Sequence, residues 1–482
     1  MRSSRSLYLA GLLACWIASR LLYLLHSRVR FNSSPLTFYL QYIDPQLLKT
    51  DLWRSTYYLN SQPPAFNWLL GLVLKILGRH ADVAFQFIFL ACGVALCLVL
   101  FSLLWRLGVP PVIAFVVTIV FTANPISALY ENWLFYTYPL VLLIALSAFF
   151  LHRYVSGNRT LDALLFFTVT AVIILVRGTY HPLWIALLFV AFLWAWPTRR
   201  RQLIAAAAVP CLLVAAVYCK NYVVFGKMFS GEVFQETNFG MMIFEHLSPS
   251  ANQKLLNERR ISGLALLSPY YWFETDRYRR FLPPVKRWGV RVLDDVLKST
   301  GAPNWNSQVM TELSRLYYLD AKNAARDYPG SYARAVISNI PGYFLPADEV
   351  WPFPDANAMK LERPLRLWHA VITGQISGTA SPPWLNYVTF PACVLFGCWY
   401  LLMLRKGGSS NLRLFDNANA LTIMFMLYTI VYTAAVTLLF SVGDHNRYRC
   451  EVSAFYAALF AMLLSTISRA RFLSRRHEPR WK

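Results

Sequence analysis

The sequence carries little charge for its length and is especially short of acidic residues. Only 15% of its 482 residues are charged, and 46 lysines and arginines stand against 24 aspartates and glutamates, a net charge of +22. Hydrophobic residues make up 57% of the chain, which excludes an ordinary soluble domain. The basic residues gather between apolar runs and near the C-terminus, a distribution typical of membrane proteins. We therefore expect membrane lipids as partners and no nucleic acid.

The cysteines of the chain also give no sign of covalent cross-links. The eight cysteines lie in or at the edge of apolar segments, and no two form a Cys-x-x-Cys pair. This pattern argues against a disulfide framework and against a cysteine zinc site. No internal repeat or low-complexity tract interrupts the chain.

Long apolar segments are what the sequence does have. Because only a helix satisfies its own backbone hydrogen bonds in hydrocarbon, each long segment predicts a membrane-spanning helix. The predicted spans are residues 7–26, 82–105, 111–128, 133–151, 161–176, 182–197, 203–219, 385–404, 418–440 and 450–468. The shorter apolar segment 65–78 is expected to be interfacial or re-entrant.

The distribution of basic residues favours the arrangement in which segment 65–78 does not cross. With a cytoplasmic N-terminus, the arginines at 199–201 and the basic loop after residue 404 then face the cytoplasm as well. The sequence therefore predicts an all-α polytopic membrane protein with ten spans and both termini cytoplasmic.

This topology divides the chain into three parts. Residues 1–219 form an N-terminal transmembrane module with a first external loop at 27–81, residues 220–384 an external, partly helical region, and residues 385–482 a C-terminal transmembrane module with a basic cytoplasmic tail. In the first loop, Asp44-Pro45 predicts the start of one amphipathic interfacial helix that carries Asp44 and Asp51 on one side. In the long region, helices are expected at 306–328 and 331–344.

Four acidic residues fall where the predicted spans meet the external face: Asp44, Asp51, Glu131 and Asp444. Charged groups beside a bilayer are costly and tend to serve a function. Their common side indicates a reaction site at that face and argues against a channel through the middle of the membrane.

Polar motifs accompany two of these positions. Gln62 and the two prolines after it open the short apolar segment, and form either a capped helix boundary or part of a substrate pocket. Glu131, followed by Tyr136, is either a loop carboxylate beside interfacial aromatics or a second acid of the site.

Basic residues on the external side run against the positive-inside bias and so need a reason. Arg177 and His181 lie in a tight turn between two spans, where arginine either snorkels or contacts an anion. In the polar run 443–451, His445, Arg447 and Arg449 form either a polar turn or a phosphate site, since arginine binds phosphate through paired hydrogen bonds.

Two further cations lie nearer the apolar segments. Lys220 closes the seventh span and either snorkels or contacts a lipid phosphate. Arg20 lies inside the first span, where we expect it to snorkel or to pair internally.

Taken in order, these motifs resemble the GT-C superfamily of integral membrane glycosyltransferases, which includes protein O-mannosyltransferases and the transferases that put aminoarabinose on lipid A. The resemblance rests on the first-loop helix with Asp44, on the Gln-Pro-Pro-Ala-Phe-Asn-Trp element at 62–68, and on the acid Glu131 at the external end of a later span. The chain departs from the family where Asp44 is followed by proline, and where Gln62 replaces the acid that aminoarabinose transferases carry before the prolines. The long loop at 220–384 has no counterpart in the resemblance.

The resemblance implies transfer of a sugar from a polyprenyl-phosphate carrier to a glycan, lipid or protein acceptor at the external face of a membrane, most naturally the bacterial inner membrane. It implies Asp44, or Asp51 in its place, as the base that takes the acceptor proton. The cationic residues would stabilise the departing lipid phosphate. Substrate contacts would come from Asp51, Gln62, Glu131, Tyr136, Arg177 and His181, and phosphate contacts from Lys220, His445, Arg447 and Arg449. No metal ligand set is predicted, and a divalent cation is left open.

Other classes of membrane protein share some of these features. A transporter or flippase of a lipid-linked sugar would have a cationic groove too, but would place ionisable groups near mid-bilayer and show paired broken helices. A polymerase or ligase of lipid-linked glycans, or a lipid phosphotransferase, would depend more on the long loop.

Overall fold

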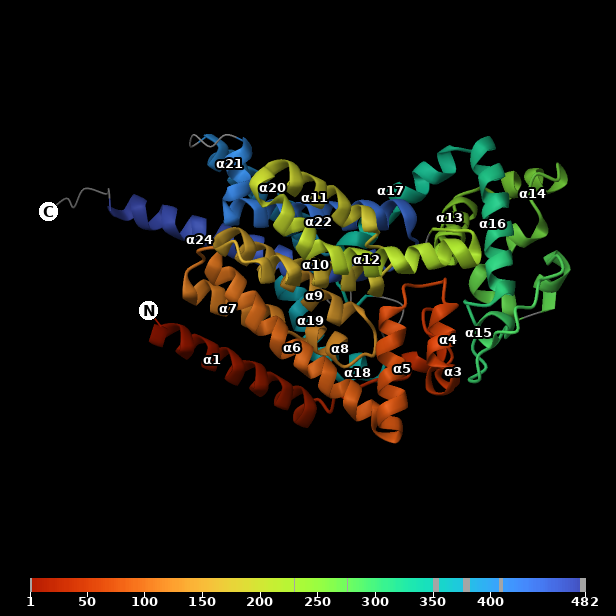
Figure 1. The fold of residues 1–482 in the computed structure, drawn as a ribbon, viewed down its shortest axis with the longest axis horizontal. Helices are drawn as coiled ribbons and strands as arrows, with labels where there is room; N and C mark the ends of the chain where they lie inside the picture. Colours follow the sequence, from red (N-terminus) through yellow and green to blue (C-terminus); the bar gives the residue numbers. More distant parts are fainter. Residues whose placement is uncertain are drawn as a thin grey trace.

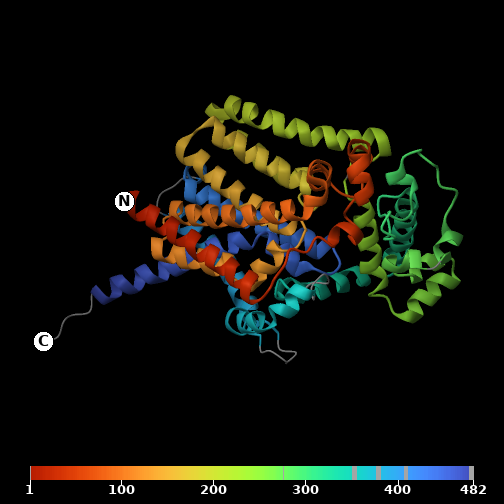
Figure 2. The same cartoon turned by 90° about the horizontal axis from the view of Figure 1, so that it is seen from below.

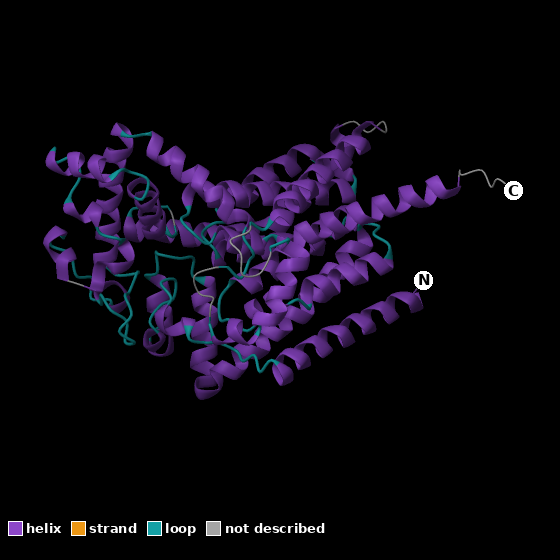
Figure 3. Ribbon diagram, turned by 180° about the vertical axis from the view of Figure 1, so that it is seen from behind, coloured by secondary structure: helices purple, strands orange, loops and turns teal. Residues whose placement is uncertain are grey.

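The computed structural model describes residues 2–228, 230–274, 276–349, 355–375, 382–406 and 411–476. Across these ranges the chain forms helices joined by loops (Figure 3), and its β-type pairings are two isolated bridges, Asn32 with Trp133 and Leu297 with Pro303. The all-α prediction is therefore confirmed. Arg480 and Lys482, predicted to end a cytoplasmic tail, lie outside the described residues.

Helices occupy every segment that the sequence predicts to cross the membrane. They are α1 (Arg2–Leu21) with the π-helical η1 (Leu22–His26), α6 (Ala81–Arg106), α7 (Pro111–Thr122) with α8 (Pro125–Glu131), α9 (Thr137–Gly157), α10 (Thr160–Val176), α11 (Pro182–Ala195), α12 (Arg200–Phe225), α20 (Trp384–Lys406), α22 (Ala418–Phe440) and α24 (Ser453–Arg476). Within the described ranges, 7 helices are long and apolar enough to cross a membrane, or 8 if the bent pair α7 and α8 forms one span. The helices α10 and α11 are shorter apolar helices. The chain is thus a polytopic membrane protein, and a count of ten crossings requires α10 and α11 to span as well.

The two predicted transmembrane modules share one apolar core. Phe425 of α22 packs edge-on against Phe166 of α10 at 5.7 Å and against Phe455 of α24 at 5.8 Å between ring centroids. The start of α1 and the end of α24 lie at one end of the molecule. The helices α13 (Glu232–Phe244), α14 (Pro249–Asn257) and α16 (Gln308–Asp327) of the long region lie at the other end, whereas α18 (Ala356–Lys360) and α19 (Glu362–Trp368) of the same region lie against the bundle (Figures 1 and 2). The division into three domains stays a prediction.

The first loop contains α2 (Pro35–Phe38), α3 (Pro45–Thr50), α4 (Leu52–Tyr57), α5 (Ala65–Leu77) and the 3-10 turn η2 (Gly78–His80). Asp44 caps α3 as predicted, since its carboxylate accepts a hydrogen bond from the Gln46 backbone N–H at 2.8 Å. The single amphipathic helix is wrong, because the backbone breaks at Asp51 (φ −137°, ψ 45°). Asp44 is buried and Asp51 is half-buried, so helical spacing does not place them on one face.

The helix α5 is too short to cross a membrane alone. At about 1.5 Å per residue its 13 residues are about 20 Å long, against a hydrocarbon core of about 30 Å. Gly78 then turns the chain with a positive φ of 48°, and α5 and α6 form a V in Figure 1. Together α5, η2 and α6 make the apolar helical segment Ala65–Arg106.

Part of the long region folds around an apolar core of its own, with Trp272, Trp305, Met310 and Tyr317 among its buried residues, whereas Leu361 and Leu365 join the core of the membrane helices. Its helices are α13 (Glu232–Phe244), α14 (Pro249–Asn257), η4 (Gly263–Leu266), η5 (Pro269–Glu274), η6 (Asp276–Phe281), α15 (Arg291–Asp294), α16 (Gln308–Asp327), α17 (Gly330–Phe344), α18 (Ala356–Lys360), α19 (Glu362–Trp368) and η7 (His369–Thr373). The helices predicted at 306–328 and 331–344 are confirmed as α16 and α17. The remaining elements are η3 (Pro197–Arg199), α21 (Asn411–Asp416) and α23 (His445–Glu451).

Candidate functional site

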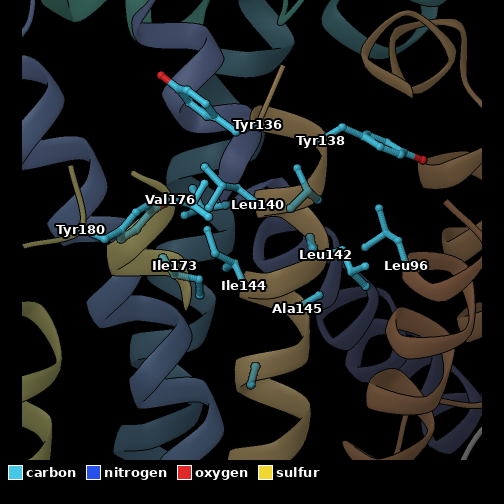
Figure 4. Packing of buried hydrophobic residues seen from close by; sticks show 14 of the residues in the cluster. Leu96, Tyr136, Tyr138, Leu140, Leu142, Ile144, Ala145, Ile173, Val176 and Tyr180 are labelled. Carbon is cyan, nitrogen blue, oxygen red and sulfur yellow. The ribbon is translucent and has the colours of Figure 1, made fainter. Parts of the chain in front are cut away.

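Two tyrosines at the start of α9 mark two separate clusters of buried charge. Tyr136, the N-cap residue, and Tyr138 point to opposite sides of the helix (Figure 4). The Tyr136 hydroxyl accepts a hydrogen bond from Arg177, whereas the Tyr138 hydroxyl donates one to Glu131 at 2.8 Å. The helix α9 therefore separates residues that the sequence groups into one site.

The first cluster is built around Arg177 and Glu451. Arg177 follows the last residue of α10, where the chain must turn before Pro182 fixes the start of α11. Its guanidinium Nε lies 3.4 Å from Oε1 of Glu451, and both side chains are buried. The same guanidinium lies over the rings of Tyr136 at 4.7 Å and Tyr448 at 4.4 Å.

Arg447 reaches this cluster from α23. Gly443 and Asp444 both adopt a positive φ, 65° and 53°, which reverses the chain after α22 and starts the short helix. Arg447 is 6% exposed, and its Nε donates to Asp444 Oδ2 at 3.3 Å. Its guanidinium lies 5.0 Å from the Phe135 ring and 5.2 Å from the Tyr448 ring, so the two arginines share Tyr448.

Several polar atoms of this cluster have no hydrogen-bond partner within the described residues. They are Nε and Nη2 of Arg177, Nη1 of Arg447, and both carboxylate oxygens of Glu451. Buried polar groups are normally paired, and guanidinium donors bind phosphate or carboxylate oxygens well. The cluster therefore combines unpaired guanidinium donors, of the kind that bind anions, with the nearby carboxylates of Glu451 and Asp444.

Two other predicted phosphate ligands, Arg449 and His445, already form hydrogen bonds within the protein. Arg449 donates to the backbone carbonyl oxygens of Tyr343 and, at 2.8 Å, of Leu345, next to the end of α17. His445 Nδ1 lies 3.2 Å from the Thr437 hydroxyl, and burial lowers the pKa of His445 to about 4. His445 is therefore neutral at pH 7. The side chain of Arg449 bonds to the end of α17 and does not join the cluster of Arg177.

The turn before α5 lies against the turn after α10. A Cβ added to Gly178 would lie 3.2 Å from the Ser230 carbonyl oxygen and 3.7 Å from Pro63 Cδ, so these segments need a glycine to pack this closely. Gln62 is half-buried in this turn. His181 caps α11, because its ring Nδ1 accepts from the Leu183 N–H at 3.3 Å. The predicted polar motif at 62–64 and the predicted turn at 177–181 are thus neighbours.

Lys220 belongs to the same neighbourhood but faces the first loop. It lies near the end of α12, which runs on to Phe225, and its ammonium donates to the Leu59 carbonyl oxygen at 3.2 Å. The ammonium also lies 5.8 Å from the Tyr57 ring and 5.6 Å from the Phe225 ring. In this arrangement Lys220 ties α12 to the loop that leads into α5.

Asp44 is held by residues from the long region. Ser299 donates its backbone N–H to Asp44 Oδ2 at 2.6 Å and its hydroxyl to Oδ1 at 2.5 Å. On either side, Lys298 donates to the Tyr39 carbonyl oxygen at 2.6 Å and Thr300 to a first-loop carbonyl at 2.7 Å. Residues 298–300 therefore clamp the first loop, and we call them the clamp.

Counted by lone pairs, Asp44 is not fully engaged. An ionised carboxylate offers about four acceptor sites. Gln46 N–H and the Ser299 hydroxyl bind Oδ1, and the Ser299 N–H binds Oδ2. One acceptor site on Oδ2 remains for a further donor.

Aromatic rings fill the space between the Asp44 loop and the start of α9. Tyr42 donates its hydroxyl to the Leu134 carbonyl oxygen at 2.9 Å, and its ring lies 5.7 Å from Phe66. Phe66 in turn packs edge-on to Tyr136 at 5.6 Å, and Tyr39 packs edge-on to Phe135 at 5.1 Å. This wall connects the clamped loop to the arginine cluster.

The second cluster, on the other side of α9, is a closed ion pair. Arg20 Nε lies 2.7 Å from Glu131 Oε1 and Nη2 lies 2.9 Å from Oε2, with Tyr138 as a third donor. The Arg20 guanidinium also lies 4.8 Å from the Trp16 ring. Of the two alternatives predicted for Arg20, snorkelling or internal pairing, the structure shows internal pairing. Glu131 pairs with Arg20 and Tyr138, on the side of α9 opposite to Tyr136, so the structure does not join it to Arg177.

Sequence reasoning missed Glu451, Tyr448, Lys298 and Ser299. Glu451 follows Arg447 at helical i, i+4 spacing, and this spacing was the available signal. The clamp carries no local signal, because it acts on residues 255 positions away. In the described part of the chain, no three His, Cys, Asp or Glu side chains gather as a metal site.

Comparisons with known proteins give one structural likeness. No family model matches the chain, and no curated protein matches it. Among solved structures, the chain is similar to the crystal structure of ArnT from Cupriavidus metallidurans bound to undecaprenyl phosphate, with 11% sequence identity and a TM-score of 0.33. The match covers 99% of this chain and 81% of that chain. We base no residue assignment on a likeness of this size.

Proposed function

We propose that this chain is a membrane glycosyltransferase that moves a sugar from a polyprenyl-phosphate carrier to an acceptor at the external face. The observation that carries the proposal is the pair of buried arginines, Arg177 and Arg447, with donor atoms left unpaired around Tyr448. A leaving phosphate needs such donors fixed in place before it departs. The GT-C resemblance of the sequence supplies the reaction class.

In this reaction the acceptor hydroxyl attacks the anomeric carbon and the bond from that carbon to the phosphate oxygen breaks. A carboxylate takes the hydroxyl proton, and the carrier leaves as polyprenyl phosphate. We propose Asp44 as the base, acting through the acceptor site that remains on Oδ2. Asp51, half-buried at the break between α3 and α4, is the alternative base.

The remaining predicted residues take supporting roles in this proposal. Arg177 and Arg447 bind the phosphate oxygens, and Tyr136 orients Arg177 by accepting its hydrogen bond. Gln62 and His181 lie in the two neighbouring turns and contact the sugar. Lys220, His445 and Arg449 shape the site through the contacts described above.

The test is release of the carrier by purified protein in nanodiscs with a panel of polyprenyl-phosphate sugars. Mass spectrometry would detect free polyprenyl phosphate formed by the wild type and absent with Asp44→Asn. Arg291→Gln, which removes an exposed arginine paired with Asp295, is the matched control and should keep full activity.

Two results would reject the proposal. One is release at the wild-type rate by Asp44→Asn and Asp51→Asn together. The other is no release with any donor while a labelled lipid-linked sugar moves between leaflets, which would assign the chain to the flippases.

A further inference from the structure

The turn that carries Arg177 meets segments from two other parts of the chain. A Cβ added to Gly178 would lie 3.2 Å from the carbonyl oxygen of Ser230, which lies just before α13. The next residue, Gly231, donates its N–H to the Asn60 carbonyl oxygen at 2.8 Å. The loop before α5, the turn after α10 and the start of α13 therefore meet beside Arg177.

The segment that leads into α16 meets the same loop. Ser61 donates its hydroxyl to Oδ1 of Asn306, and both residues are fully buried. The backbone of Asn306 is held as well, because its N–H donates to Oδ1 of Asn304 at 3.1 Å. We call the place where these segments meet the junction, and define it by its residues: 60–61, 177–178, 230–231 and 304–306.

Three side chains of the junction are not fully hydrogen-bonded. Within the described residues, Oδ1 of Asn60, Oγ of Ser230 and Nδ2 of Asn306 are buried and have no hydrogen-bond partner. Ser230 is 4% exposed and Asn306 is 0% exposed. Buried polar atoms of native proteins are almost always paired. The three atoms therefore have unused capacity to bind a ligand.

The types of these atoms select the kind of ligand. An amide Nδ2 donates, an amide Oδ1 accepts, and a serine hydroxyl does both. The hydroxyl groups of a sugar also donate and accept, so they can satisfy all three atoms. A phosphate or carboxylate offers acceptors alone and would leave Asn60 Oδ1 unpaired, and a hydrocarbon chain would leave all three unpaired. The side chains therefore match a neutral group with several hydroxyls.

An aromatic ring links the junction to Arg447. The ring of Tyr270 lies 5.9 Å from that of Trp305, the residue before Asn306. The Tyr270 side chain is 47% exposed, although the surrounding protein raises the pKa of its hydroxyl to about 12, and Asp444 and Arg447 lie close enough to affect that pKa. Ligand sites combine open aromatic faces of this kind with a few placed polar groups.

We propose that the junction binds a neutral sugar ring through its hydroxyl groups, with Asn60, Ser230 and Asn306 as hydrogen-bond partners and Tyr270 as an aromatic wall. None of these side chains carries a charge, so the ligand is an uncharged hexose or pentose and not an amino sugar or a uronic acid. Because Arg177 adjoins the junction, a phosphate on the anomeric carbon would lie toward the arginines. Only the identity of this sugar with the one that polyprenyl phosphate carries rests on the proposed function.

The test measures sugar binding without any carrier. Full-length protein in nanodiscs is mixed with methyl glycosides of neutral hexoses and pentoses and of one amino sugar, and saturation-transfer NMR detects which of them bind. We expect transfer to at least one neutral glycoside and none with empty nanodiscs. Ser230→Ala and Asn60→Ala should each weaken binding about fivefold, the effect of losing about one hydrogen bond.

Two controls separate ligand binding from a structural role. Each alanine variant removes an atom that has no partner in the described chain, so neither should lower the Tm of the ligand-free protein. Thr118→Val is the matched control, because it removes an equally buried and unpaired hydroxyl from α7, which packs against α1, α6 and α24. It should leave glycoside binding unchanged.

Sugar 1-phosphates distinguish this site from the proposed phosphate site. The 1-phosphate of a sugar whose glycoside binds should bind about tenfold more tightly, and Arg447→Gln should remove that gain. Glycoside binding without any gain from the phosphate would count against the proposed reaction and still support the sugar site.

Three outcomes would overturn the inference. The first is no saturation transfer to any glycoside, which would leave water as the partner of the three atoms. The second is equal affinity in the wild type and both alanine variants, which would place the bound sugar elsewhere. The third is tighter binding of the amino-sugar glycoside than of every neutral one.

Discussion

The two buried arginine–glutamate pairs on either side of α9 are made of the same residue types and differ in how completely they are satisfied. Arg20 and Glu131 form two bonds of 2.7 and 2.9 Å, and Tyr138 donates a third bond to the carboxylate. Arg177 and Glu451 approach only to 3.4 Å, and both keep atoms without hydrogen-bond partners in the described structure. We call Arg20–Glu131 the closed pair, because its hydrogen bonds are made within the protein and stabilise the fold. We call Arg177–Glu451 the open pair, because its unpaired polar atoms can still bind a ligand.

The closed pair should dominate stability. Glu131→Gln leaves Arg20 buried without a counter-ion, and breaking such a pair costs about 3–5 kcal/mol. We expect the largest fall in Tm of any variant discussed here, measured by tryptophan fluorescence in nanodiscs. The double variant Arg20→Met with Glu131→Leu should recover most of the loss, because it removes both charges. If Glu131→Gln melts with the wild type, the pair is not structural.

The open pair should dominate activity. Arg447→Gln removes donors from the proposed phosphate site, and loss of one such donor typically costs about 10² to 10³ in rate. We expect that loss in carrier release, with a smaller fall in Tm than Glu131→Gln produces. Arg20→Lys, on the other side of α9, should lose less than tenfold. Equal losses from both changes would remove the functional contrast between the pairs.

Glu451→Gln tests the contrast within the open pair. Within the described residues neither carboxylate oxygen accepts a hydrogen bond, so Glu451→Gln removes the ion pair with Arg177 at 3.4 Å, whereas Glu131→Gln also disrupts two hydrogen bonds to Arg20. We expect its destabilisation to be smaller than that of Glu131→Gln by about 2 kcal/mol. Removing this negative charge should also strengthen phosphate binding, so added polyprenyl phosphate should raise the Tm of the variant more than that of the wild type. A smaller rise would show that Glu451 does not face the bound anion.

The clamp offers a matched pair of variants. Ser299→Ala removes a hydroxyl bond to Asp44, whereas Thr300→Ala removes a bond of similar length from the same turn to a backbone carbonyl. Each should cost about 1 kcal/mol of stability. Only Ser299→Ala should also slow carrier release, by about tenfold, because it loosens the proposed base. Equal rates for the two variants would assign Asp44 a structural role.

The last contrast concerns Lys298, a buried cation of the clamp. Burial lowers the pKa of Lys298 to about 7, although Asp44 opposes the shift. Between pH 7 and the ordinary lysine pKa near 10.4, the unfolded chain binds a proton that the folded chain does not, so this group makes stability rise with pH. Lys298→Met should flatten that rise in Tm measured from pH 7 to pH 10. An unchanged slope would place the titration elsewhere.

The sequence predicted the parts of the molecule that depend on local pattern. The apolar segments, the Asp44 cap of α3 and the helices α16 and α17 follow from periodicity and capping chemistry, and the structure contains them. The break at Asp51 was missed because Leu47 to Ser55 keep helical spacing across it. When apolar residues keep helical spacing on both sides of a backbone break, the sequence pattern does not reveal the break.

The contacts that define the candidate site were beyond such reasoning. Glu451 meets Arg177 from a helix 274 positions later in the sequence, and Ser299 reaches Asp44 from the long region. No periodicity records contacts of this range. The sequence also grouped Glu131 and Arg177 in one site, and it could not show that Tyr136 and Tyr138, two residues apart, point to opposite sides of α9.

Tyr136 and Tyr138 both lie at the start of α9, so this one helix connects the Arg177–Glu451 pair to the Arg20–Glu131 pair. A rotation of α9 about its own axis would displace the Tyr136 hydroxyl from Arg177 and the Tyr138 hydroxyl from Glu131 at the same time. The hydrogen bond from Tyr138 to Glu131 therefore restrains that rotation and keeps Tyr136 within hydrogen-bond distance of Arg177.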